Sequence, residues 1–208
     1  MSALRILGRP SSINVRKVLF AADESGLAYD HEEQWGTAEA PTASAAFLKF
    51  NPKALVPVIV DDGVVLTESN TICRYFAARA GRDDLLPGAP ADRARVEMWM
   101  DWQATELNDS WRYAFMALVR RSPQYADAAL ARESAVRWNG MMSILDRRLE
   151  ETGAYIAGET FTLADIVVGL SAHRWRSTPI AHAELTAVRA WLARLDARAA
   201  FQRWTKDP

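Results

Sequence analysis

Residues 51–70 read NPKALVPVIVDDGVVLTESN, and most of the predicted fold follows from this segment. At its centre Asp-Asp-Gly (61–63) separates two short apolar runs, and Asp-Gly favours the positive backbone angles of a tight hairpin turn. We therefore expect strands over residues 57–60 and 64–66, joined by that turn. A glutamate and a serine follow, and they mark the start of a helix over residues 69–80, because serine is a favoured capping residue.

A proline opens the first strand of this hairpin. Pro57 has no amide hydrogen to give to a sheet, and a cis Val56–Pro57 peptide bond is one of the few arrangements that tolerate it. Such a bond would leave the amide and carbonyl of Val56 free to hold an extended peptide. A trans proline at a sheet edge is the alternative, because only about 5–6% of X–Pro bonds are cis.

Strands and helices alternate before this segment, and helices alone follow it. We expect strands at residues 3–7 and 29–34 and a helix over 14–26, which predicts a small mixed sheet with helices packed on it. Downstream, 3-4 apolar spacing dominates, and the most apolar helix begins at Thr162. The predicted fold is α/β plus all-α, with a thioredoxin-like domain, a turn-rich linker and a helical bundle domain at residues 1–82, 83–90 and 91–208.

Composition excludes several classes of protein. Among 208 residues, 25 basic and 26 acidic side chains leave a net charge of −1, which argues against a nucleic-acid partner and against a polybasic membrane anchor. The single cysteine, Cys73, rules out an intramolecular disulfide and a cysteine-rich zinc site, and the three histidines have no ligand spacing, so we expect no metal. No signal peptide and no apolar run of about 20 residues occur, so we expect a cytoplasmic protein without a membrane span.

Two segments place polar groups at predicted helix starts. In residues 8–18, GRPSSINVRKV, a strand gives way to a helix, and Ser11, Ser12 and Asn14 stand where free amides and a partial positive charge stabilise an anion. The second segment is residues 66–72, LTESNTI, where a strand gives way to a helix. Here Ser69 and its neighbouring amides could bind a carboxylate, and Glu68 could bind an ammonium group. The alternative in both places is a plain helix cap.

A third helix start has a role in folding rather than chemistry. In residues 161–166, FTLADI, Thr162 is the predicted N-cap, and Asp165 at the third helical position can reach back to its amide. We expect removal of either side chain to cost on the order of 1 kcal/mol or more.

Four of these motifs, in their order and spacing along the chain, together resemble the cytosolic glutathione S-transferases. They are the segments at residues 8–18, 51–58, 66–72 and 161–166, so the resemblance covers essentially the whole chain. Serine-type members have a serine facing the glutathione sulfur, a basic residue four positions later and an aliphatic residue two beyond that. Ser12, Arg16 and Val18 match this pattern, and Ser11 remains a rival for the serine. The resemblance implies glutathione as co-substrate, no metal, and a glutathione-binding set formed by Lys53, Val56, Pro57, Glu68 and Ser69.

A serine hydroxyl and a helix N-terminus together can stabilise the glutathione thiolate by the amount required. A free thiol has a pKa of about 8.5, and lowering it by about two units requires roughly 2.7 kcal/mol of thiolate stabilisation. A helix N-terminus contributes about 0.3–2 kcal/mol and one hydrogen bond to a charged group about 1.5–3 kcal/mol. We therefore expect Ser12 to donate a hydrogen bond to the sulfur, with no nucleophilic role of its own.

The resemblance also implies a second substrate and a second subunit. A small hydrophobic electrophile would lie against the long first helix of the all-α domain, with Arg112, Tyr113 and Met116 lining its pocket. In the implied homodimer, Asp101 and Gln103 would reach the partner subunit's glutathione. Core and dimer packing is the alternative for this helix, and a glutathione-dependent isomerase, dehalogenase or peroxidase, or a non-enzymatic binding module, is the alternative for the function.

Overall fold

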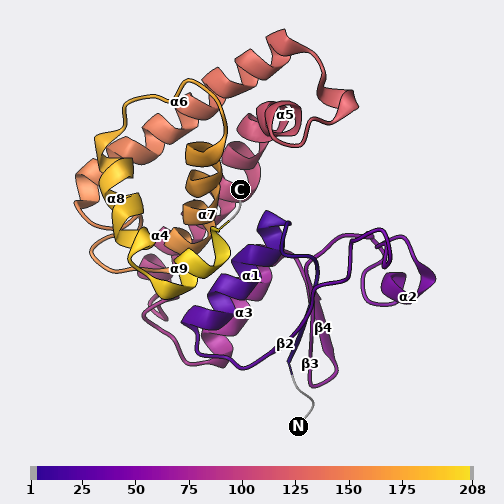
Figure 1. The fold of residues 1–208 in the computed structure, drawn as a ribbon. Coiled ribbons are helices and arrows are strands. Elements are labelled where there is room, and N and C mark those ends of the chain that lie inside the picture. Colours follow the sequence, from indigo (N-terminus) through magenta and orange to yellow (C-terminus); the bar gives the residue numbers. More distant parts are fainter. Residues whose placement is uncertain (1–3, 207–208) are drawn as a thin grey trace. The chain divides into compact units, whose positions relative to one another are not determined.

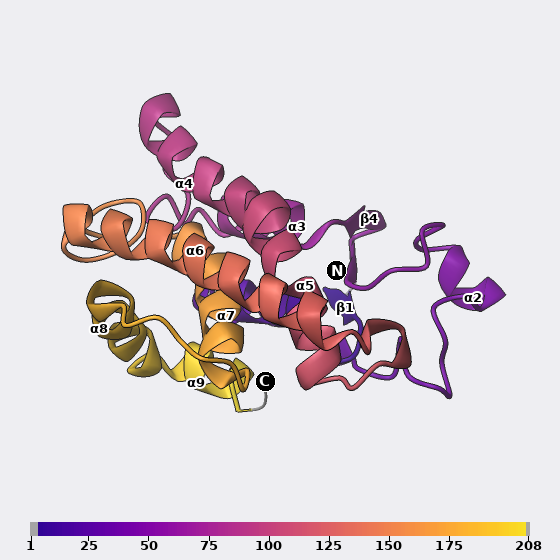
Figure 2. The ribbon, with the colours of Figure 1, turned by 90° about the horizontal axis from the view of Figure 1, so that it is seen from above.

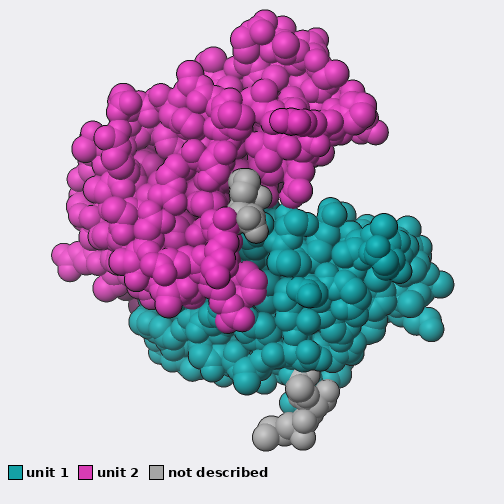
Figure 3. Space-filling model, in the orientation of Figure 1, with its two compact units in different colours: residues 1–87, 207 teal, residues 88–206, 208 magenta. Residues whose placement is uncertain are grey.

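The computed structural model describes residues 4–206, which form two compact units. The first unit comprises residues 4–87 and the second comprises residues 88–206 (Figure 3). The first is an α/β unit and the second is helical (Figure 1). The predicted fold class, a thioredoxin-like domain followed by a helical domain, is confirmed.

The first unit is built on a four-stranded sheet with the strand order β2-β1-β3-β4. Strands β1 (Arg5–Leu7) and β2 (Asp30–Glu32) are parallel, whereas β3 pairs antiparallel with β1. Strands β3 (Val58–Asp61) and β4 (Val64–Thr67) form the predicted hairpin. The turn between these two strands takes positive φ values of 45° at Asp62 and 84° at Gly63, as the Asp-Gly signal predicts.

Two helices pack on the same side of this sheet (Figure 1). They are α1 (Ile13–Glu24) and α3 (Ser69–Arg79), whose buried residues include Val15, Val18, Ile72 and Phe76. A short helix, α2 (Ala45–Leu48), places Phe47 in a cluster with Leu7 and Val58. Both helices were expected from the sequence, and these four buried residues contribute to the core of the unit.

The second unit begins with a long helical stretch (Figure 2). Helix α4 (Pro90–Trp102), the π-helical segment η1 (Gln103–Leu107) and α5 (Asn108–Leu118) follow without a break. No pattern in the sequence predicted the π-helical segment. After a 3₁₀ turn, η2 (Pro123–Tyr125), come α6 (Ala128–Thr152), α7 (Leu163–Ser177), α8 (Thr186–Asp196) and α9 (Ala199–Trp204).

Helix α7 is the central helix of this unit, as its apolar sequence predicts. Every residue from Leu163 to Trp175 is buried. A Cβ atom built on Gly169 would lie 2.7 Å from Leu195 Cδ1, so glycine allows α8 to approach α7 closely. Within residues 4–206, no helix combines the length and the apolar composition that crossing a membrane requires.

Candidate active site

Four chain segments meet at one edge of the sheet in the first unit. Strands β1 and β2 are parallel and both end at this edge, at Leu7 and Glu32. Strand β3 begins there, because Leu7 pairs with Val58, and β4 ends there, because Thr67 pairs with the same residue. This register brings together the segments that carry Ser11, Ser12 and Asn14, Val56 and Pro57, and Glu68 and Ser69.

The turn between β1 and α1 makes a close contact with the proline loop. Gly8 adopts a φ of 145°, and a Cβ atom built on it would lie 2.6 Å from Val15 Cγ2 and 2.9 Å from Val56 Cβ. Only glycine fits this approach, because any larger side chain would push α1 and the proline loop apart. Gly8 therefore fixes how closely the Ser12 turn and Val56 can lie.

Two further side chains, His31 and Arg16, support this turn. Nε2 of His31 lies 2.8 Å from the Gly8 carbonyl oxygen, and Nε of Arg16 donates to the Pro10 carbonyl at 2.6 Å. Long helical side chains point back toward the helix N-terminus, so the position of Arg16 one turn after Ser12 was a usable signal. His31 gave no signal, since its partner is a backbone atom in the turn that follows another strand, β1.

Ser12 is the N-cap residue of α1, but its side chain makes no capping hydrogen bond. The plain-cap alternative is therefore not realised, and the half-buried hydroxyl remains able to serve a ligand. The first amides of α1 lack intrahelical partners, as at every helix start, and they carry a partial positive charge. Ser11 lies half-buried in the preceding turn and Asn14 half-buried in the first turn of α1.

The Val56–Pro57 peptide bond is cis, so the first of the two alternatives considered for this proline is the one that occurs. Asn51, which is 3% exposed, shapes the preceding loop: its Nδ2 donates to the Leu55 carbonyl at 2.7 Å and its Oδ1 accepts from the Lys53 amide at 3.1 Å. Among the residues described, neither the amide nor the carbonyl of Val56 has a hydrogen-bond partner. The loop thus offers an extended ligand one donor and one acceptor.

The start of α3 holds a strained residue. Glu68 has φ 68° and ψ 108°, and its side chain makes no capping bond. Non-glycine residues in such conformations cost about 1–3 kcal/mol and cluster at ligand-binding sites. Ser69 follows as the first residue of α3 and is 9% exposed, so a second helix N-terminus, with its free amides, begins just after β4 ends at this edge.

Lys53 and Glu68 form an ion pair with each other, a contact that no sequence pattern predicted. Nζ of Lys53 donates to Oε1 of Glu68 at 2.8 Å, and the two side chains are 58% and 64% exposed. An ion pair this exposed is worth about 1 kcal/mol or less. A ligand that carries both a carboxylate and an ammonium group can therefore replace it at little cost.

Cys73 is not a candidate nucleophile. The thiol is fully buried, and burial raises its pKa to about 12. Because only the thiolate reacts, any sulfur chemistry at the sheet edge needs a sulfur from a ligand. The described residues also contain no group of three or more histidine, cysteine or acidic side chains placed to hold a metal ion.

In the helical unit, the Thr162–Asp165 capping box is present. Oδ2 of Asp165 accepts from the Thr162 amide at 2.9 Å and from its hydroxyl at 3.2 Å. The other oxygen accepts from the Ile156 amide at 3.1 Å and from Trp191 Nε1 at 2.9 Å. Burial raises the pKa of Asp165 to about 6, although these hydrogen bonds oppose the shift. Asp165 therefore joins three segments as well as capping α7.

One expectation for the first long helix is wrong. Gln103 is fully buried, and its Nε2 donates to Ser171 Oγ at 3.0 Å, so it cannot reach a partner subunit's glutathione. Its amide instead satisfies a polar group inside the helical core. Asp101 is exposed on the same helix, and its predicted role stays a prediction.

The three residues expected to line an electrophile pocket lie on α5. Arg112 is exposed, and Tyr113 and Met116 are half-buried. The Tyr113 hydroxyl accepts from the Asp127 amide at 3.2 Å, and its ring packs edge-on against Tyr125 at 5.1 Å. The tyrosine therefore also ties α5 to the start of α6, and the pocket role of all three residues stays a prediction.

The chain matches known proteins over its full length. The glutathione S-transferase N-terminal domain matches residues 11–79, and the C-terminal domain of the same family matches residues 127–194. Glutathione S-transferase GstB of Escherichia coli (strain K12) is 35% identical over 167 residues, 79% of each chain. Glutathione S-transferase 3 of Zea mays is 31% identical over 98% of this chain and 93% of its own.

A solved structure agrees with these matches. The theta class glutathione S-transferase from the citrus canker pathogen Xanthomonas axonopodis pv. citri, with glutathione bound, is 36% identical. The match has a TM-score of 0.91 and covers 100% of this chain and 99% of that one. The two domain matches, the curated relatives and this structure together show that the chain belongs to the glutathione S-transferase family.

Proposed function

We propose that this chain is a glutathione transferase that stabilises the glutathione thiolate with the Ser12 hydroxyl and the N-terminus of α1. The thiolate then adds to a small hydrophobic electrophile. The observation that carries the proposal is the convergence, at one edge of the sheet, of an unused serine hydroxyl at a helix start, the unpaired Val56 backbone and the Glu68–Ser69 segment. Glutathione in the Xanthomonas relative supports the choice of thiol.

The tripeptide has one group for each feature of this edge. Its γ-glutamyl ammonium would bind Glu68, and the carboxylate beside that ammonium would bind the Ser69 hydroxyl and the first amides of α3. Its cysteinyl backbone would pair with the Val56 amide and carbonyl in strand fashion, next to cis Pro57. Its glycyl carboxylate would bind Lys53, so the ligand would replace the Lys53–Glu68 pair with two ion pairs.

The sulfur would then lie over the start of α1. Ser12 would donate its hydroxyl hydrogen to the thiolate, and Asn14 would orient groups in the same helical turn. Gly8 and Arg16 would act as positioning residues, since both fix the turn that carries Ser12. Arg112, Tyr113 and Met116 are the residues proposed to meet the electrophile.

We also propose a homodimer in the cytoplasm. Strand β4 is an edge strand that exposes Val64 and Val65 (47% and 42%), and α4 exposes Met98 (53%). Exposed apolar edge strands need a cover, and a second subunit would supply one. In that dimer Asp101 would contact the partner subunit's glutathione. Sedimentation equilibrium tests the dimer, and a sedimenting mass of about one chain would contradict it.

Replacement of Ser12 tests the catalytic proposal. In Ser12→Ala we expect kcat to fall by roughly tenfold to a hundredfold, the loss of one hydrogen bond to a charged sulfur, while calorimetry shows glutathione binding nearly unchanged. Ser11→Ala is the matched control and should keep its activity. The reverse result, with activity lost in Ser11→Ala alone, would move the role to Ser11. Failure of the unmodified chain to bind millimolar glutathione would favour a non-enzymatic binding module.

A further inference from the structure

The turn that carries Ser12 also carries a cation that the proposed transferase site does not use. Arg9 begins this turn, and the Ser12 amide donates to the Arg9 carbonyl at 3.2 Å. Two residues that close a turn in this way have Cα atoms less than about 7 Å apart. The Arg9 side chain therefore leaves the backbone close to the serine whose hydroxyl is proposed to face the sulfur.

The segment after β2 fixes the backbone of Arg9. The Arg9 amide donates to the Trp35 carbonyl at 2.9 Å, which ties the turn to that segment. Trp35 is itself held, because its Nε1 donates to Oε2 of Glu32 at 2.8 Å and its ring lies 5.3 Å from the ring of Phe47. The arginine thus starts from a fixed point, so a ligand has little ordering of the backbone to do.

The side chain of Arg9 lies along Gly36, and its charge is available to a ligand. A Cβ atom built on Gly36 would lie 3.6 Å from both Cδ and Nε of Arg9, so the arginine stem packs against this glycine. Arg9 is exposed, and within residues 4–206 its guanidinium takes part in no ion pair or hydrogen bond. The carboxylate that ends β2, Glu32, is already bound by Arg5 and Trp35.

The proposed glutathione complex leaves this cation without a counterpart. In that complex Glu68 binds the ammonium group, and Ser69 with the start of α3 binds the neighbouring carboxylate. Lys53 binds the glycyl carboxylate, and the thiolate lies over Ser12. Every charged group of glutathione then has a partner, so the charge of Arg9 is left for the molecule that meets the sulfur, the second substrate.

We propose that Arg9 selects electrophiles that carry one carboxylate on an otherwise apolar body. This inference rests on the proposed transferase function and names the class of its second substrate. The planar guanidinium pairs with a carboxylate through two parallel N–H···O bonds. In the reaction the sulfur forms a bond to the electrophilic carbon, and the leaving group departs with its electron pair. The thiol proton passes to solvent, and the carboxylate stays unchanged on Arg9.

Two matched electrophiles test this proposal on the full chain. The anion is 4-chloro-3,5-dinitrobenzoate and the neutral control is 4-chloro-3,5-dinitrobenzamide; in both, sulfur replaces chloride. Each rate at saturating glutathione is divided by the rate of the same compound with free glutathione, which removes their difference in intrinsic reactivity. We expect this enhancement to be roughly threefold to tenfold larger for the acid. The difference should lie mainly in KM, because the carboxylate is charged both before and during the reaction.

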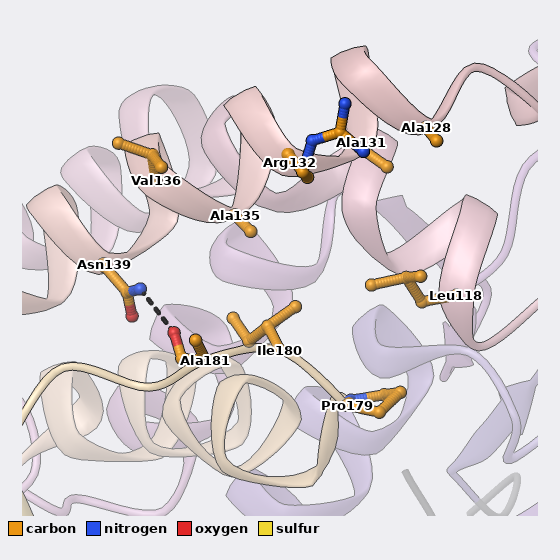
Figure 4. Close-up of a pocket in the computed structure, with 10 residues that line it drawn as sticks. All are labelled: Leu118, Ala128, Ala131, Arg132, Ala135, Val136, Asn139, Pro179, Ile180 and Ala181. Carbon is orange, nitrogen blue, oxygen red and sulfur yellow. Dashed lines mark hydrogen bonds between the residues drawn. The ribbon is translucent and has the colours of Figure 1, made fainter.

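Variants assign the preference to one side chain. Arg9→Gln should raise KM for the acid by the same factor, with the amide and the calorimetric binding of glutathione unchanged. Arg9→Lys keeps the charge without the planar fork and should keep part of the preference. Arg132→Gln is the matched control and should change neither substrate. Arg132 is also exposed and makes no ion pair with any described residue, but Figure 4 shows it on α6, at a pocket that Ala128, Ala131 and Ala135 also line.

The outcomes separate this proposal from the transferase itself. Equal enhancement of the acid and the amide would overturn the role of Arg9 and leave the transferase standing. A preference for the acid that survives in Arg9→Gln would do the same. Weaker glutathione binding in Arg9→Gln would overturn it by assigning Arg9 to a carboxylate of glutathione. Conjugation of neither compound would contradict both proposals.

Discussion

Asp165 should contribute more to stability than an ordinary helix cap. It is fully buried and accepts from the Thr162 amide and hydroxyl, the Ile156 amide and the Trp191 indole. In Asp165→Ala the three N–H donors lose their acceptor, and each unsatisfied buried donor costs about 1–3 kcal/mol. The simple sum is roughly 3–9 kcal/mol, and because the donors share one site we expect about 4 kcal/mol.

The charge of the same side chain predicts a dependence on pH. Burial raises the pKa of Asp165 to about 6 in the folded chain, against about 3.9 in the unfolded chain. Between these values the folded state binds more protons than the unfolded state, so stability falls as pH rises from about 4 to 6. Two pKa units correspond to about 3 kcal/mol. Asp165→Asn removes this term, so its stability relative to the unmodified chain should rise by about that amount between pH 4 and 7.

Urea unfolding followed by tryptophan fluorescence measures both effects, because seven of the eight tryptophans lie in the helical unit. Asp109→Asn, at an exposed position on α5, is the control and should show neither change. A loss below about 1 kcal/mol in Asp165→Ala would refute the hydrogen-bond argument. A difference between Asp165→Asn and the unmodified chain that does not vary with pH would refute the charge argument.

Two further predictions concern the sheet edge. Gly8→Ala should lower kcat/KM at least tenfold and lower the free energy of unfolding in urea by about 2 kcal/mol or more, because the added Cβ would lie 2.6 Å from Val15 Cγ2. The control is Gly26→Ala, which is also at positive φ but has no atom within 4 Å of the added Cβ. This variant should keep its activity. Glu68→Gln should weaken glutathione binding roughly tenfold in calorimetry, because the variant loses the partner of the ligand's ammonium group. Glu133→Gln is the control and should not weaken binding, since Glu133 belongs to an ion pair of similar exposure on α6. Equal behaviour of variant and control would contradict either prediction.

Structural features formed by residues close together in the chain were predictable from the sequence. The turn of the Asp-Asp-Gly hairpin and the Thr162–Asp165 box are local, because Asp61 pairs with Val64 and Thr162 with Asp165, three residues apart in both cases. The cis bond at Pro57 was predictable only through its neighbours in the chain, since a lone proline before a strand leaves both isomers open.

Features that depend on distant partners were not predictable. Gln103 seemed able to reach another subunit, but Ser171, 68 residues away, holds it in the core. The Lys53–Glu68 pair and the contact of His31 with Gly8 likewise join residues from different segments.

The pKa of the bound glutathione thiol tests the central claim most directly. Ultraviolet absorbance of the thiolate, titrated against pH with glutathione bound, gives this value for the unmodified chain and for Ser12→Ala. We expect the bound thiol to titrate about two units below the ~8.5 of a free thiol, and Ser12→Ala to lose at least about one unit of that shift. A thiol that titrates near 8.5 in the unmodified chain, or one whose pKa does not change in Ser12→Ala, would contradict the role of Ser12.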